Sequence, residues 1–325
     1  MILKDRYSRI IDYMRVSVTD RCNLRCVYCM PPGGVRQIVH KEILRYEEIA
    51  RIVGGSAELG VRKIRITGGE PLARKNIQAL IRDIRSIDGI EDLSLTTNGI
   101  LLEKYAAELK DCGLDRVNVS LDTLKAERYT EITRGGDFGT VMRGIEEALR
   151  CGLGPVKINV VPIRGLNDDE VLDFARLTVD TPYHVRFIEF MPVGDRAYYN
   201  EKMHIPTDEI KSVVESLGEL KPVKLRRNGP AKYYKLPGGE GVIGFISAMT
   251  HHFCRDCNRL RLTSDGKLRP CLFSETEIDL KAPMRRGAPD EEIRRLLRLA
   301  IEAKPEGHYI LGKAGKGRSM SAIGG

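Results

Sequence analysis

The chain has 325 residues, of which 42% are hydrophobic and 30% charged. That apolar content excludes a wholly disordered chain, and the length predicts one large domain or two ordinary ones. Lys and Arg number 53 against 45 Asp and Glu, so the net charge of +8 favours anionic partners. No apolar run approaches the roughly 18 residues of a membrane span. The first residues lack an apolar signal region, so we expect a cytoplasmic protein without a membrane segment.

Short apolar runs alternate with helical periodicity over the first part of the chain, which predicts βα units around a parallel sheet. The expected strands are 14–18, 63–67, 92–96, 116–120, 157–161 and 185–190. Apolar stripes predict core-facing helices at 77–84, 102–109 and 141–149, and a further helix begins at Asp290. Polar and Gly-rich sequence follows several strands, at the carboxyl ends where parallel sheets and βα barrels bind ligands.

The alternation of short apolar runs with helical periodicity ends at about residue 195. Two apolar runs, 232–236 and 242–246, are separated by a Gly-rich stretch and predict a β-hairpin. The end of the chain, 312–325, is rich in Gly, Ser and Lys, and we expect it to be mobile unless something holds it. We therefore expect one domain over 1–195 and a C-terminal segment over 196–325.

Six of the eight cysteines stand in two groups of three. The groups are Cys22, Cys26 and Cys29, then Cys254, Cys257 and Cys271. Disulfides are disfavoured in a large intracellular chain, so clustered cysteines predict metal ligands. A structural zinc site closes with four ligands, whereas three thiolates on a [4Fe–4S] cluster leave one iron open. The alternative is zinc with a distant fourth ligand, which for the second group would be His251 or His252.

The first group has the spacing C-x3-C-x2-C after the first expected strand, with Tyr28 before its third cysteine. Gly68-Gly69-Glu70-Pro71 follows the second expected strand. Together these motifs resemble the radical S-adenosylmethionine (SAM) superfamily. The resemblance implies a [4Fe–4S] cluster on this group, whose open iron chelates SAM, and reductive cleavage of SAM to a 5′-deoxyadenosyl radical. It also implies that a glycine backbone approaches the methionine amine, which a carboxylate helps to hold. The implied SAM-binding residues are Tyr28, Gly69, Ser120 and Met191.

The second group has the spacing C-x2-C-x13-C, and Arg259 and Arg261 occupy alternate positions between its cysteines. An extended chain would direct both arginines to the same side. Paired guanidinium groups beside a cluster suit a polyphosphate. A solvated basic face is the alternative interpretation.

Residues 15–23, the Gly-Gly-Glu-Pro motif, the second cysteine group and the final Gly324-Gly325 together resemble the GTP 3′,8-cyclase family of molybdenum cofactor biosynthesis. The resemblance covers nearly the whole chain. It implies an α/β fold, an incomplete parallel (βα)6 barrel whose open side is closed by a C-terminal segment with a second three-cysteine [4Fe–4S] cluster. The implied GTP-binding residues are Arg15, Arg65, Thr96, Lys157, Arg259, Leu260 and Arg261, with Leu260 contributing only backbone.

The resemblance also implies the reaction. Hydrogen abstraction from the GTP ribose C3′, attack on guanine C8 and reduction would give 3′,8-cyclo-7,8-dihydro-GTP. The implied catalytic residues are Arg259, Arg261, Gly324 and Gly325, and the basic Lys313, Lys316 and Arg318 would follow an anionic ligand inward. The implied partners are an external electron donor and a downstream pterin-forming enzyme, cyclic pyranopterin monophosphate synthase. A homodimer is left open, and no stable complex with nucleic acid is expected.

Two other function classes compete with this interpretation. A radical SAM enzyme that modifies a peptide generally carries a fuller C-terminal cysteine set, so three cysteines count against it. A basic zinc protein that binds nucleic acid would be colourless and would bind with a steep salt dependence. Cys112 and Cys151 belong to neither group, and we interpret both as buried small apolar residues.

Overall fold

The computed structural model describes residues 3–193, 198–225, 229–308, 318 and 320–323. Within them, twelve strands form one sheet in the order β12-β11-β10-β1-β2-β3-β4-β5-β6-β9-β8-β7. The parallel strands are β1 (Tyr13–Ser17), β2 (Lys63–Thr67), β3 (Asp92–Thr97), β4 (Arg116–Ser120), β5 (Lys157–Val160), β6 (His184–Ile188), β9 (Val242–Ile246) and β10 (Arg259–Leu262). Antiparallel strands complete the two edges, namely β7 (Lys221–Val223), β8 (Lys232–Lys235), β11 (Lys267–Arg269) and β12 (Ile278–Asp279).

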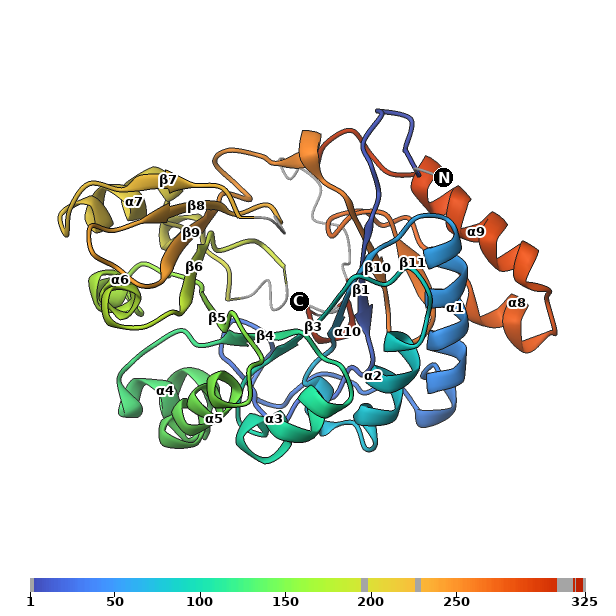
Figure 1. Ribbon diagram of the computed structural model, residues 1–325, viewed down its shortest axis with the longest axis horizontal. Helices are drawn as coiled ribbons and strands as arrows, with labels where there is room; N and C mark the ends of the chain where they lie inside the picture. Colours follow the sequence, from blue (N-terminus) through green and yellow to red (C-terminus); the bar gives the residue numbers. More distant parts are fainter. Residues whose placement is uncertain (1–2, 194–197, 226–228, 309–317, 319, 324–325) are drawn as a thin grey trace.

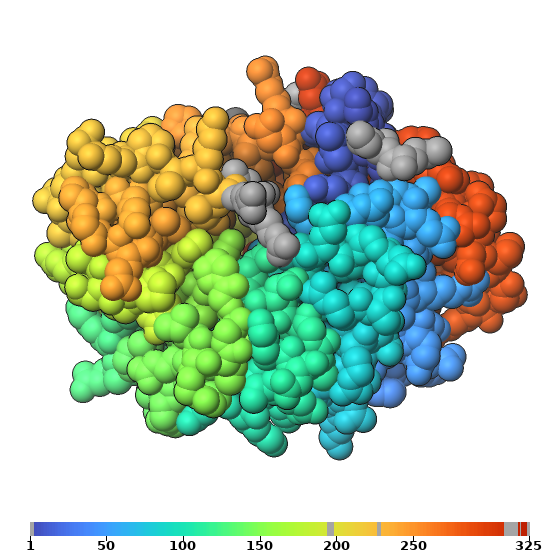
Figure 2. Space-filling model, viewed as in Figure 1, coloured from blue at the N-terminus to red at the C-terminus, as the bar shows by residue number. Residues whose placement is uncertain are grey.

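The six strands expected before residue 195 are confirmed, with small shifts at their ends. The expected hairpin is also confirmed as the antiparallel pair β8–β9. The C-terminal strands extend the sheet on both sides, because β10 pairs with β1 and β9 pairs with β6. Figure 2 shows the consequence, with orange C-terminal residues on one side of the molecule and red ones on the other. The result is an α/β fold with a mostly parallel sheet.

Helices follow the strands and, apart from the short C-terminal helix α10 (Met320–Ile323), lie on the outside of the curved sheet (Figure 1). They are α1 (Tyr46–Glu58), α2 (Ile77–Arg85), α3 (Leu102–Asp111), α4 (Ala126–Thr133), α5 (Phe138–Arg150), α6 (Val171–Asp180), α7 (Thr207–Glu215), α8 (Lys281–Arg285), α9 (Asp290–Glu302) and α10 (Met320–Ile323). The predicted stripe of α2 is buried along its length, because Ile77, Leu80 and Ile84 face the core. None of the helices among the described residues is long and apolar enough to span a membrane.

Two expectations about single residues need correction. Leu149 was assigned to the core face of α5 but is 36% exposed, because it lies at the last turn of that helix. Cys112 is buried as expected, whereas Cys151 is only half-buried and its thiol contacts Glu147 at 3.2 Å. Most of the stretch 312–325, which was expected to be mobile unless something holds it, lies outside the described residues, but residues 320–323 form α10, and Ile323 is only 2% exposed.

Candidate active site

One cavity of about 280 Å³ joins the two cysteine groups across a face of the sheet. The first group follows the carboxyl end of β1, whereas Cys257 lies just before β10, which runs parallel to β1. The two groups therefore lie at opposite ends of a five-residue strand, a length of about 16 Å at roughly 3.3 Å per residue. Cys29 lines one end of this cavity, and Cys254, Cys257 and Cys271 line the other.

The three cysteines of the first group are half-buried, and desolvation is the largest influence on their pKa values. Burial raises the pKa of Cys29 to about 12, and the negative charges of Cys22 and Asp122 act in the same direction. Burial also raises the pKa of Cys26 well above its usual range, and so does the nearby Cys29 thiol. Three adjacent thiols in this state fit a positively charged iron–sulfur cluster, since metal binding favours the thiolate form.

Tyr28 connects this loop to the sheet. Its hydroxyl donates a short hydrogen bond to Asp122, which follows β4 and also accepts from the backbone N–H of Val161 at 2.8 Å. Burial raises the pKa of Asp122 to about 6. Tyr28, Ser120 and Met191 all line the cavity, as the sequence analysis expected for a SAM site. Asp122 joins them, although no role was assigned to it from the sequence.

The Gly-Gly-Glu-Pro motif performs a structural task that the sequence analysis missed. A Cβ on Gly69 would lie 2.3 Å from the carbonyl oxygen of Arg21, so this glycine allows the loop before Cys22 to approach closely. The buried Glu70 carboxylate accepts from the Thr97 hydroxyl at 2.8 Å and from the Asn98 N–H at 2.7 Å. These bonds occupy the carboxylate in joining the ends of β2 and β3. The expectation that it helps to hold the methionine amine stays a prediction.

The second cysteine group lies among cations. Although burial opposes ionisation, the positive charges of Arg259 and Lys304 lower the pKa of Cys257 to about 6. Lys304 is only 2% exposed. Its ammonium group donates to the Cys257 thiol at 3.4 Å and to the carbonyl oxygens of Arg259 and Pro270, each at 2.8 Å. Because Pro270 precedes Cys271, Lys304 connects the two chain segments that carry this group.

We expect Lys304→Met to destabilise the protein, because methionine fills a similar space but leaves the two carbonyl oxygens without their donor. An unsatisfied buried acceptor costs about 1–3 kcal/mol. The free energy of unfolding, measured by anaerobic urea unfolding of the reconstituted protein, should fall by about that amount or more. Lys202→Met, at an exposed position, is the control. Equal urea midpoints for Lys304→Met and the parent protein would contradict this role.

Basic side chains line the cavity between the two cysteine groups. Among the described residues, nine basic and two acidic side chains line it. The strand register explains their alignment, because Arg15 pairs with Arg261 on one side and with Arg65 on the other. Paired residues of neighbouring parallel strands point to the same face. The row continues through Ser94 to Arg116.

Protein carboxylates neutralise part of this charge, including that of Lys63, which pairs with Asp12 at 2.8 Å. Arg116 forms a bidentate ion pair with Asp92 at 2.6 and 2.8 Å. By contrast, burial and the charge of Arg261 lower the pKa of Arg15 well below its usual range. Several buried polar atoms of the cavity have no partner among the described residues, namely Tyr13 OH, Arg15 Nε, Thr96 Oγ1, Arg116 Nε, Asn159 Oδ1 and Arg186 Nε. Buried polar groups normally have partners, so this cavity fits a polar anion.

The surroundings of Lys157 lower its pKa strongly. Burial, together with the charges of Arg186, Arg116 and Arg65, lowers the pKa of Lys157 to about 6. Its ammonium group lies 5.7 Å from the ring centre of Tyr233. At neutral pH this lysine is therefore mostly uncharged until an anion enters the cavity.

We expect GTP binding near pH 7.5 to be accompanied by proton uptake at Lys157, because phosphate charge raises the lowered pKa. Affinity should therefore fall as the pH rises above about 6. Titration calorimetry in buffers of different ionisation enthalpy measures the number of protons bound. Lys157→Met should take up fewer protons than the parent protein, whereas the titration of GTP itself contributes equally to both. The same proton uptake by both proteins would rule out this assignment.

The cavity brings together most of the residues that the sequence analysis assigned to GTP, namely Arg15, Arg65, Thr96, Lys157, Arg259 and Arg261. Leu260 is completely buried in the core on the opposite face of β10, in agreement with a backbone-only role. Gly324 and Gly325, with Lys313 and Lys316, lie outside the described residues.

The two histidines considered as alternative zinc ligands contact other groups of the protein. His251 pairs with Asp208 at 2.8 Å, and the ring of His252 bonds the Ala248 carbonyl at 3.0 Å. Among the described residues, no three His, Cys, Asp or Glu side chains are grouped as ligands of a single metal ion. Sequence reasoning missed Lys304, Arg116 and Arg186. Arg116 stands at the start of an expected strand. Its place in the cavity follows from the strand register, which aligns it with Arg65 through Ser94.

The chain resembles known proteins over its whole length. A family model described as the radical SAM superfamily matches residues 16–178, and one described as Molybdenum Cofactor Synthesis C matches 183–310. The GTP 3′,8-cyclase of Pelotomaculum thermopropionicum is 53% identical, over 99% of this chain and 100% of the relative. That of Heliobacterium modesticaldum is 52% identical, over 99% of each.

Solved structures share the fold at low sequence identity. Streptococcus suis SuiB bound to S-adenosylmethionine superposes with a TM-score of 0.60 at 15% identity, over 84% of this chain and 64% of that one. SuiB bound to its precursor peptide SuiA superposes with a TM-score of 0.62 at 14% identity, over 92% of this chain and 68% of that one. The superfamily model spans half of the chain, and the cyclases match all of it at about 52% identity. The chain is therefore a member of the GTP 3′,8-cyclase family within the radical SAM superfamily.

Proposed function

We propose that this protein converts GTP to 3′,8-cyclo-7,8-dihydro-GTP in the first step of molybdenum cofactor biosynthesis. The observation that carries the proposal is the cavity lined by buried arginines, with Cys29 of the first group at one end and Cys254, Cys257 and Cys271 at the other. The names of the relatives support the same reaction. A nucleoside triphosphate has about four negative charges, which suit the row formed by Arg15, Arg65 and Arg261 on one face of the sheet.

The residues at both ends fit iron–sulfur clusters. Membership of the radical SAM superfamily implies one [4Fe–4S] cluster and SAM, and we assign them to Cys22, Cys26 and Cys29. When bound, this pair supplies a carbon-centred radical that abstracts hydrogen from an unactivated position. A second cluster on Cys254, Cys257 and Cys271 is part of the proposal, supported by the cations that favour thiolates there.

The chain's own residues bind and orient the two ligands. SAM would lie beside the first cysteine group, in contact with Tyr28, Gly69, Ser120 and Met191. Gly69 would contact SAM through its backbone. Arg259 and Arg261 would hold the triphosphate, while Thr96 and Lys157 lie further along the cavity. The guanine would reach the second group, which places the ribose between the clusters.

We also propose a domain organisation and partners for this chain. We infer a partial (βα)6 barrel over residues 1–195 and a C-terminal segment over 196–325 that covers its open side. Gly324 and Gly325 are proposed to act at the cavity without side chains. An external electron donor would reduce the clusters, and cyclic pyranopterin monophosphate synthase would use the product. A homodimer and a cytoplasmic location remain expectations.

Anaerobic reconstitution followed by incubation with SAM, GTP and a reductant tests this function. Mass spectrometry should find 5′-deoxyadenosine and a cyclised guanine nucleotide, and iron analysis should give about eight irons per chain, because each cubane cluster holds four. A colourless protein with about two zinc ions would refute the proposal. Cleavage of SAM without any change in GTP would place the protein in the superfamily but with another substrate.

A further inference from the structure

We propose that Arg318 is a positioning residue that docks the C-terminal helix α10 on the wall of the cavity through Asp265 and Glu277. This inference deepens the proposed function and rests on it only for the effect on the reaction. From the sequence, Arg318 is expected to follow an anionic ligand into the active site. Instead, its guanidinium group is bound by two carboxylates of the protein.

The contacts of Arg318 are numerous and directional. Its Nε donates to Glu277 Oε1 and its Nη2 to Glu277 Oε2, each at 2.7 Å, so the pair is bidentate. Its Nη1 donates to Asp265 at 2.9 Å. All three side chains are at most one quarter exposed. A bidentate pair with a second carboxylate fixes the plane of the guanidinium group and is stronger than a single exposed ion pair.

Helix α10 needs such a tertiary anchor. It has four residues, too few to form a stable helix alone. Ala322 and Ile323 are buried, whereas Met320 lines the cavity. Arg318 stands two residues before α10, so its ion pairs hold the chain where this helix begins. The described end of the chain is thus attached at Arg318 and packed at Ile323, with Met320 facing the site between them.

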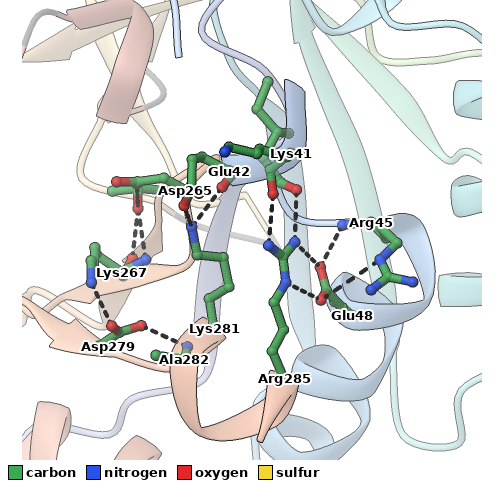
Figure 3. A network of polar contacts seen from close by, with 12 residues as sticks. Lys41, Glu42, Arg45, Glu48, Asp265, Lys267, Asp279, Lys281, Ala282 and Arg285 are labelled. Atoms are coloured by element: carbon green, nitrogen blue, oxygen red, sulfur yellow. Dashed lines mark hydrogen bonds and ion pairs between the residues drawn. The ribbon is translucent and has the colours of Figure 1, made fainter. Parts of the chain in front are cut away.

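The carboxylates belong to a part of the molecule that is joined by many polar contacts. Asp265 lies in the turn between β10 and β11, and the Thr263 hydroxyl donates to it at 2.6 Å. Figure 3 shows Asp265 within a polar network that joins β11 to α8 and to the start of α1. In that network Lys267 pairs with Asp279 at 2.6 Å, and Arg285 of α8 pairs with Glu48 of α1 at 2.7 Å.

Glu277 extends the anchor to the second cysteine group. Its Oε1 also accepts from Arg269 at 2.7 Å. The buried Arg269 in turn donates to the carbonyl oxygens of Leu272 and Ser274, in the loop directly after Cys271. One carboxylate therefore holds both the C-terminal helix and the loop of the third cysteine, so the placement of α10 and of that cysteine is coupled.

Hydrogen exchange of the full-length reconstituted protein tests the docking without substrates. Arg318→Gln should speed exchange in the peptide containing residues 320–323 at least tenfold, and Arg318→Lys should recover part of the protection. Arg295→Gln, which removes an exposed pair with Glu292 on α9, is the control and should leave that peptide unchanged. Glu277→Gln should speed exchange in residues 320–323 and also in residues 272–274. Unchanged exchange of residues 320–323 in Arg318→Gln would overturn the proposal.

The second readout concerns the reaction. With iron content and thermal unfolding equal to those of the parent protein, Arg318→Gln should lower the ratio of cyclised nucleotide to 5′-deoxyadenosine at least fivefold. An unchanged ratio would show that docking does not position α10 for the reaction and would also overturn the proposal. If the parent protein itself forms no cyclised nucleotide, the proposed function fails, and the exchange experiment still decides whether Arg318 docks the helix.

Discussion

Replacing Cys29 by alanine is expected to abolish reductive cleavage of SAM, whereas replacing Cys271 by alanine is expected to preserve it. The two residues lie at opposite ends of one cavity, so each substitution removes a ligand from one group and leaves the other intact. SAM requires the open iron of the first cluster. Loss of Cys271 removes the anchor proposed for the guanine, so 5′-deoxyadenosine should form without cyclised nucleotide.

Anaerobic assays that quantify 5′-deoxyadenosine and the nucleotide product separate these two effects. Iron content should fall by about half in each variant, since each would lose one of the two proposed clusters. Cys151→Ala is the matched control, because this half-buried cysteine lies at the end of α5, and the structure places its thiol against Glu147. If Cys271→Ala forms product at an undiminished rate, the second group is structural and the proposed mechanism is wrong.

Much of the fold could be predicted from periodicity alone. The six parallel strands, the hairpin and helices such as α9 follow apolar patterns that are local in sequence, so their detection needs no knowledge of contacts. The site was predicted from motif spacing in the same way. Arg259 and Arg261 were expected to point to one side of an extended chain, and β10 confirms this arrangement.

What could not be predicted depends on register and on contacts between distant segments. Arg15 and Arg261 are 246 positions apart, and only the parallel pairing of β1 with β10 aligns them. Lys304 resembles any other lysine at the end of a helix until its carbonyl acceptors are known. The same holds for Arg318, whose partners come from a turn and an edge strand region. A polar residue's role follows from its partners, which sequence periodicity does not reveal.

Replacing Arg15 by methionine is expected to weaken GTP binding while raising the stability of the free protein. Arg15 is buried beside Arg261 and Arg65, and its Nε has no partner among the described residues. Desolvation and repulsion from these cations already lower the pKa of Arg15, so its charge costs stability in the absence of an anion. Methionine keeps a long unbranched side chain and removes that charge.

The affinity for GTP should fall about ten- to a hundredfold, because a hydrogen bond to a charged group contributes roughly 1.5–3 kcal/mol. Calorimetry with GTP and guanosine measures this loss, and thermal unfolding of the same samples measures stability. Arg261→Met should show a comparable loss of affinity, since the two arginines are paired in register, and Arg295→Met is the surface control. Equal loss of affinity for guanosine and for GTP would show that these side chains do not bind phosphate. Opposite changes in affinity and stability identify a site whose buried cations are retained for an anionic ligand rather than for the fold.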